Sequence, residues 1–111
     1  IPYWDYDAPV TKETPRDVSA ASVTASAMIE LSTMVPDGQK YLDYAEKILK
    51  SLSSDAYLAK VGDNQGFILM HSVGSLPNGS EIDTPLNYAD YYYLEALKRF
   101  MNLKGINYKD I

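Results

Sequence analysis

One imidazole, several carboxylates and one indole are the side chains of this sequence that could take part in chemistry. His71 is the only histidine among the 111 residues, and it follows the short apolar run 67–70 into a stretch of glycines, serines and a proline. Two interpretations are open: a packed histidine bonded to backbone, or a ligand-facing donor or general acid/base. The local sequence alone favours the packed histidine.

Four aspartates, Asp5, Asp7, Asp17 and Asp90, are candidates for acid–base work. Paired carboxylates can act in general acid/base catalysis on sugars, and Asp5 and Asp7 lie within the aromatic stretch "YWDYD". The structural alternative, which the sequence favours, is that Asp17 caps a helix while Asp5 and Asp7 bond to turn backbone. Asp90 lies among tyrosines, where it is either solvated or a buried partner of a tyrosine hydroxyl.

The aromatic residues are skewed toward tyrosine, with ten Tyr against two Phe and one Trp. Amphipathic rings of this kind suit sugar sites, but they also pack between helices. Trp4 could stack on a sugar ring or plug the core, and both readings stay open. Tyr91, Tyr92 and Tyr93 are consecutive, so on a helix they point three ways and cannot form one stacking platform.

The totals exclude several classes of function. A net charge of −5 argues against a nucleic-acid or anionic-membrane surface, since both need clustered Lys and Arg. The absence of cysteine excludes disulfides and thiolate metal sites. No run approaches the roughly 18 apolar residues of a membrane span. No nucleotide loop, zinc motif or nucleophile elbow is present.

The first ten residues do not form a signal peptide, because they lack a basic start and an apolar run. They also lack a starting Met, so we expect either a processed chain or a piece of a longer protein. The compartment is not indicated, and periplasm and cytoplasm both remain open.

Three helices are predicted to position these side chains. The first has Thr14 as N-cap, Pro15 at N1 and Asp17 at N3, and runs to about Val35, where Pro-Asp-Gly stops it. It is rich in serine and alanine, so we expect neighbours on more than one side. The second spans 39–53 and has the single apolar face of a surface helix.

The third predicted helix is rich in tyrosine. Asp83 or Thr84 is expected to cap it, and Pro85 fits its N1 position. The helix should end near Lys104, with Gly105 as the C′ residue.

Outside the helices we expect little regular structure. Residues 1–13 are irregular, 67–70 are a strand fragment or an extended core segment, 71–83 are a loop, and 106–111 are a tail. The fold class is therefore all-α, with at most one short strand. The other two predicted helices are too few to surround the first helix. The sequence therefore indicates part of a larger helical assembly.

Four stretches together resemble the unsaturated glucuronyl hydrolases, glycoside hydrolase family 88. They are "YWDYDAP", "RDVSAASVTASAMIELS", "YLDYAEKILKSL" and "ILMHSVGSLPNGSEIDTPLNYADYYYLEALKR". They occur in the family's order, cover almost the whole chain and match the family's C-terminal third. The four stretches together are specific for this family, whereas any one of them alone is weak evidence of the resemblance.

The resemblance implies an (α/α)6 barrel, of which residues 1–111 would be the C-terminal segment of a single domain. The first helix would be an inner helix and the second an outer one. The resemblance also implies the reaction, which is hydration of the 4,5-double bond of the unsaturated uronic acid that polysaccharide lyases leave at a non-reducing end. An aspartate protonates C4 and helps water add at C5. The hemiketal opens and releases the rest of the oligosaccharide, without metal or cofactor.

The resemblance assigns no catalytic residue to this chain, because the family's catalytic aspartates lie in its N-terminal half. It implies instead a substrate-binding wall. Trp4 and His71 match positions that approach the substrate, which turns the balance for His71 toward a ligand-facing ring. Ser72 and Ser75 fit a Ser-x-x-Ser-x-Lys pattern that holds a sulfate in some members. Pro77 stands in place of the Lys, so the cation of that pattern is lost.

The expected partners are an unsaturated uronic-acid oligosaccharide and the remainder of the barrel, and the segment alone should be inactive. An alternative of another class is a non-catalytic helical module for carbohydrate binding or interaction. The sequence does not indicate which polysaccharide is degraded.

Overall fold

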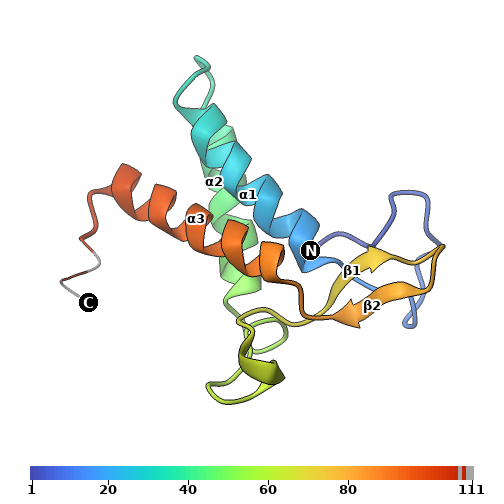
Figure 1. The fold of residues 1–111 in the computed structure, drawn as a ribbon. Coiled ribbons are helices and arrows are strands. Elements are labelled where there is room, and N and C mark those ends of the chain that lie inside the picture. The colour runs from blue at the N-terminus through green and yellow to red at the C-terminus, as the bar shows by residue number, and fades with distance from the viewer. Residues whose placement is uncertain (108, 110–111) are drawn as a thin grey trace.

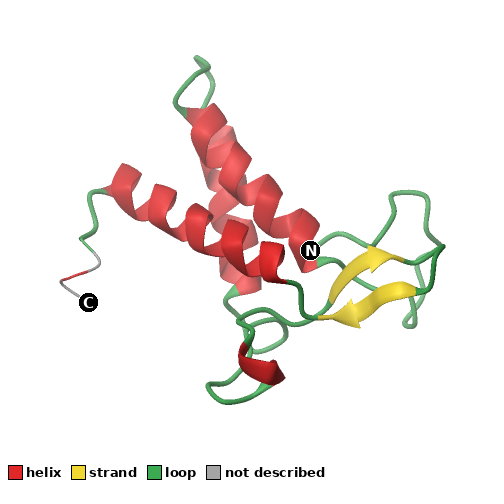
Figure 2. Ribbon diagram, viewed as in Figure 1, coloured by secondary structure: helices red, strands yellow, loops and turns green. Residues whose placement is uncertain are grey.

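The computed structural model describes residues 1–107 and 109, which form three α-helices and a small antiparallel hairpin (Figure 1, Figure 2). The elements are α1 (Val18–Ser32), α2 (Gln39–Leu52), the 3-10 turn η1 (Asn64–Gly66), β1 (Ser72–Ser75), β2 (Ser80–Thr84) and α3 (Asn87–Lys104). Three main helices with irregular loops confirm the predicted class. Of the predicted tail, residues 108, 110 and 111 lie outside the described residues.

Helix α1 lies between the other two helices. It packs against both α2 and α3, whereas α2 and α3 barely touch each other. In Figure 1, α3 crosses α1, whereas α2 runs back along α1. Small side chains allow this close approach, since Ser22 and Ala25 are completely buried and Ser26 is 1% exposed. The prediction that neighbours surround this helix on more than one side is confirmed.

Helix α2 and the end of α3 follow the sequence closely. α2 begins at Gln39 and buries Leu42, Ala45 and Leu49 on one face, as expected for a one-sided helix. α3 ends at Lys104, and Gly105 follows it in the left-handed conformation with a φ of 72°. Glycine adopts this conformation without the steric cost that a Cβ brings.

The start of α1 differs from the prediction, because Thr14 is not its N-cap. Asp17 caps the helix instead and accepts hydrogen bonds from Ser19 N–H and Oγ at 3.0 and 2.7 Å. The backbone just before it is extended and pairs with the N-terminal residues, with Trp4 N–H donating to Pro15 O at 3.0 Å. This long-range pairing keeps Pro15 out of the helix.

Helix α3 also begins later than predicted. Asp83 and Thr84, expected as its caps, belong to β2. Leu86 is the residue before the helix, and it has an extended backbone and no side-chain cap. Pairing with β1 takes up the residues that the local sequence offers as caps.

Residues 71–83 are predicted as a loop, but residues 72–84 form a hairpin instead. β1 and β2 pair antiparallel with Val73 opposite Ile82, and a tight turn joins them. The register shifts next to this pair, which leaves Asp83 as an extra residue on β2. Such a bulge bends a strand and re-aims its side chains.

The stretch before the hairpin is an extended core segment rather than a strand. Leu69 is completely buried and makes an isolated bridge to Leu58. Asp90, on the first turn of α3, holds this stretch with both carboxylate oxygens, accepting from the N–H groups of Ile68 and Leu69 at 2.8 and 2.9 Å. Asp90 therefore bonds to backbone and is neither solvated nor a partner of a tyrosine.

Replacing Gly74 with alanine is expected to destabilise the hairpin by about 1–3 kcal/mol through overpacking. A Cβ at Gly74 would lie 2.7 Å from the Cβ of Glu81 on the facing strand. Thermal unfolding of the intact protein measures the loss. Adding Glu81→Gly should restore stability, because Glu81 has a φ of 54° that glycine adopts easily. An unchanged midpoint in Gly74→Ala would contradict this close contact.

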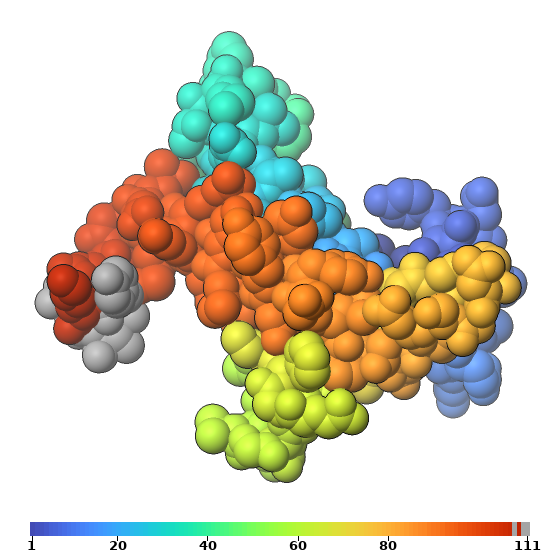
Figure 3. Space-filling model, in the orientation of Figure 1, coloured from blue at the N-terminus to red at the C-terminus, as the bar shows by residue number. Residues whose placement is uncertain are grey.

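The two ends of the helical layer differ in what lies beside them. The N-terminal ends of α1 and α3 lie beside the hairpin and the N-terminal segment, whereas the α1–α2 turn and the end of α3 project away from them (Figure 1, Figure 3). All four residues selected from the sequence as substrate-binding, Trp4, His71, Ser72 and Ser75, belong to the hairpin end. Within residues 1–107 and 109, no helix is long and apolar enough to cross a membrane.

Candidate functional site

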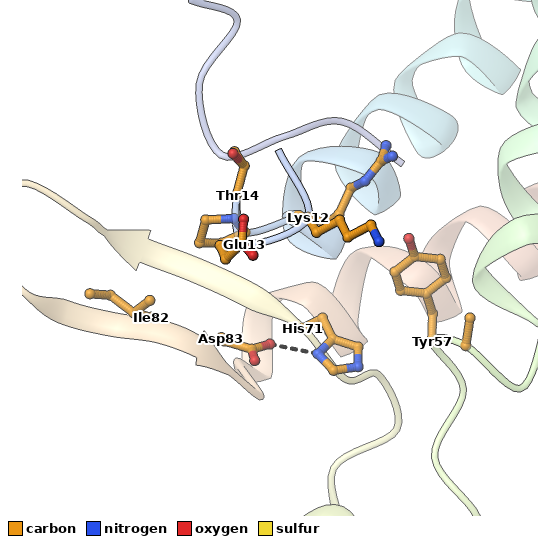
Figure 4. A pocket seen from close by; sticks show the side chains of 10 residues that line it. Lys12, Glu13, Thr14, Tyr57, His71, Ile82 and Asp83 are labelled. Atoms are coloured by element: carbon orange, nitrogen blue, oxygen red, sulfur yellow. Dashed lines mark hydrogen bonds and ion pairs between the residues drawn. The ribbon is translucent and has the colours of Figure 1, made fainter. Parts of the chain in front are cut away.

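A pocket of about 440 Å³ lies at the hairpin end (Figure 4). Residues 12–16 line it from the N-terminal segment, Tyr57 and its neighbour Ala56 from the loop after α2, and His71, Ile82 and Asp83 from the hairpin region. Three stretches that are far apart in the sequence therefore meet around the single imidazole.

His71 and Asp83 face each other at the base of the hairpin. The Nδ1 of His71 lies 2.5 Å from Oδ1 of Asp83, so the imidazole and the carboxylate are in direct hydrogen-bonding contact. Both residues have left-handed backbones, with φ values of 72° and 50°. This conformation is uncommon outside glycine, although Asp and His are among the residues that tolerate it. The bulge and the left-handed backbones together bring the two side chains into contact.

Asp83 fixes the orientation of the His71 ring. With the carboxylate at Nδ1, Nε2 is the nitrogen left for a ligand. Tyr57 packs edge-on against the ring, with 6.1 Å between the centroids and 85° between the planes. The His71 side chain is nevertheless 44% exposed. The imidazole is thus held on two sides and open to the pocket, and it is not the packed, backbone-bonded histidine that local sequence favours.

The other three selected residues lie outside this pocket. Trp4 is half-buried in the N-terminal segment. Ser72 is completely buried, and among the described residues its Oγ has no hydrogen-bond partner. Ser75 is half-buried near the turn and accepts from Nδ2 of Asn78 at 2.9 Å. The two serines do not share an exposed surface in this structure.

The aspartates of this end have structural tasks. Asp17, besides capping α1, accepts from Val73 N–H at 3.2 Å and so joins β1 to the helix. Asp5 accepts from Asp7 N–H at 2.7 Å, as in a turn. The structural reading of Asp5 and Asp17 is confirmed. In the part of the chain that the structure describes, no group of three or more His, Asp and Glu residues could hold a metal ion.

Tyr88, on the first turn of α3, is a further polar group at this end. Partial burial raises the pKa of Tyr88 above its ordinary value, and the carboxylates of Glu81 and Asp17 raise it further. Each of these effects favours the neutral phenol, so its hydroxyl remains a possible hydrogen-bond donor.

Sequence reasoning missed Lys12, Tyr57 and Asp83 as neighbours of His71. Lys12 and Tyr57 give no local signal, because only the tertiary fold brings them to the imidazole. Asp83 did have one. If residues 71–84 are interpreted as a hairpin with a tight turn at 76–79, His71 lies opposite residues near 83.

Known proteins that are similar to this chain include curated enzymes and solved enzyme structures of one kind. The curated unsaturated glucuronyl hydrolase of Formosa agariphila is 50% identical over 103 residues, which are 93% of this chain and 26% of that protein. A crystal structure of an unsaturated glucuronyl hydrolase specific for heparin covers 96% of this chain and 29% of its own, with 66% identity and a TM-score of 0.92. No protein-family model matches the chain.

A mutant unsaturated glucuronyl hydrolase from Streptococcus agalactiae, complexed with dGlcA-GalNAc6S, matches 90% of this chain and 27% of its own with 31% identity and a TM-score of 0.81. The chain spans about a quarter of the length of the curated relatives it matches. These enzymes have an (α/α)6 barrel, and α1, α2 and α3 are part of such a barrel, as the sequence predicted.

Proposed function

We propose that the chain, a member of the unsaturated glucuronyl hydrolases (glycoside hydrolase family 88), is the C-terminal segment of such an enzyme's barrel. The intact enzyme hydrates the 4,5-double bond of the unsaturated uronic acid at the non-reducing end of lyase-generated oligosaccharides. A proton adds at C4 and a hydroxyl at C5, and the hemiketal opens and releases the remaining sugar. The similarity to the Formosa enzyme, 50% identity along 93% of this chain, carries the proposal.

This segment contributes substrate-binding residues and no catalytic aspartate. Asp17 and Asp90 are both engaged with backbone N–H groups at the hairpin end, which leaves neither free for proton transfer. His71, oriented and half-exposed in its pocket, is the best-supported contact to the sugar. Trp4 is proposed as a second contact, by stacking in the intact barrel.

Ser72 and Ser75 are weaker members of the proposed wall. Ser75 is partly accessible, whereas Ser72 is completely buried. Because Pro77 also replaces the Lys of the Ser-x-x-Ser-x-Lys pattern, a sulfate site of that kind is not part of the proposal.

The substrate class that we propose is glycosaminoglycan-derived unsaturated disaccharides. The solved enzyme that shares 66% identity with this chain is described as specific for heparin. Heparin-derived disaccharides are therefore the first to test, with chondroitin-derived ones as the comparison.

An absorbance assay on the intact protein tests the activity. Hydration removes the conjugated double bond of the substrate, so the ultraviolet absorbance of lyase-generated disaccharides should fall, and faster for heparin-derived than for chondroitin-derived ones. Residues 1–111 alone should leave it unchanged. Sugar binding without any loss of absorbance by the intact protein would instead support the alternative, a non-catalytic carbohydrate-binding module.

A further inference from the structure

We propose that Lys12, Tyr57 and His71 form a binding site for an oxyanion of the substrate, a carboxylate or a sulfate. The inference rests on the proposed function and deepens it, because it assigns a place to the negatively charged groups that such oligosaccharides carry.

Lys12 is the available cation of the pocket. It lines the pocket together with His71, and its side chain extends toward Tyr57 (Figure 4). Among the described residues, no carboxylate lies within ion-pair distance of its Nζ. The nearby Arg16 is committed elsewhere, since it donates to Tyr3 Oη at 3.3 Å and its guanidinium lies 4.1 Å from the centroid of the Tyr3 ring. Lys12 therefore supplies a flexible ammonium that a ligand can engage.

Tyr57 and His71 provide two further polar groups beside Lys12. The Tyr57 ring stands edge-on to the imidazole, and its hydroxyl points toward the Lys12 side of the pocket (Figure 4). His71 lines the same pocket, and because its Nδ1 lies against Asp83, Nε2 is the ring nitrogen left for a ligand. An ammonium and a phenol hydroxyl beside an imidazole are groups that a carboxylate or sulfate can engage.

The acidic side chains of the pocket do not block this site. Asp83 is occupied by its hydrogen bond to His71. Glu13 lies at the other end of the pocket, away from Tyr57 (Figure 4). Residues 71–84 contain no Lys or Arg, so the hairpin itself offers no competing cation. Lys12 and Tyr57 thus lie at one end of the pocket and Glu13 at the other, which would orient an anionic sugar within its 440 Å³ (Figure 4).

Lys12→Met and Tyr57→Phe in the intact enzyme test the inference. The substrates are unsaturated disaccharides with and without sulfate, produced by one lyase. We expect KM to rise about tenfold in Lys12→Met and less in Tyr57→Phe, with kcat little changed, because a charge-assisted contact made in both the ground and transition states is lost. Lys60→Met is the matched control, since Lys60 is exposed, lies outside the pocket and carries the same charge.

The pattern across substrates identifies the anion. A rise in KM for sulfated substrates alone assigns the site to a sulfate, and an equal rise for both assigns it to the uronate carboxylate. KM values of Lys12→Met that match those of Lys60→Met for both substrates would overturn the proposal. If the wild-type protein hydrolyses no disaccharide, the proposed function fails. Calorimetric binding of the same disaccharides to wild type and Lys12→Met then decides the oxyanion site, and equal affinities refute it.

Discussion

Replacing Asp17 with alanine is expected to lower the free energy of unfolding of the intact protein by about 3 kcal/mol. Loss of the N-cap accounts for about 1 kcal/mol, and a buried N–H left unpaired at Val73 costs about 1–3 kcal/mol more. Asp17 is 9% exposed, and its carboxylate accepts from Ser19 N–H, Ser19 Oγ and Val73 N–H. Denaturant-induced unfolding, monitored by circular dichroism, measures the change.

Asp17→Asn is the matched control for that experiment. Asparagine keeps an acceptor oxygen and is as good an N-cap as aspartate, so this variant should lose less than half as much stability. Equal stability of Asp17→Ala and the wild type would refute the view that one carboxylate joins α1 to β1.

Replacing His71 with alanine should lower kcat/KM of the intact enzyme roughly tenfold to a hundredfold, the effect of removing one hydrogen bond to a charged ligand. The same change should alter stability little, because the side chain is 44% exposed. The absorbance assay on a lyase-generated disaccharide measures the first effect, and a thermal melt measures the second.

Variants of Asp83 and Trp4 sharpen the result. Asp83→Asn keeps an acceptor for Nδ1 and should retain most activity, whereas Asp83→Ala frees the ring and should approach His71→Ala. Trp4→Ala should also impair turnover, and Trp4→Phe, which keeps a ring face, should impair it less. Normal turnover in both His71→Ala and Trp4→Ala would rule out the proposed substrate-binding wall.

The interiors of the helices could be predicted from the sequence, but two of their starts could not. The apolar face of α2 repeats with helical spacing, so local information suffices there. Thr14 and Pro15 look like a helix start, yet pairing with the N-terminal residues holds that backbone extended. Asp83 and Thr84 look like caps, yet they pair with β1. In both places a long-range contact overrides a valid local signal.

The site was predictable only in part. His71 stands out because it is the single histidine and follows a short apolar run. Its partner Asp83 depends on a bulge, and Lys12 and Tyr57 depend on how distant loops meet. The hairpin escaped recognition because β2 is exposed along most of its length, so it lacks the alternation of apolar and polar residues that marks a strand.

The base and the tip of the hairpin are held very differently. Asp17, the N-cap of α1, holds β1, and Asp90 on the first turn of α3 holds the stretch that leads into it. Among the described residues, the turn at 76–79 instead makes local bonds, such as Gly79 N–H to Leu76 O and Asn78 to Ser75. Changes in the length or sequence of the tip would leave His71 in place. The hairpin therefore combines a fixed anchor with an adjustable edge, and in the proposed sugar site such an edge can vary in length and sequence while the contact from His71 is kept.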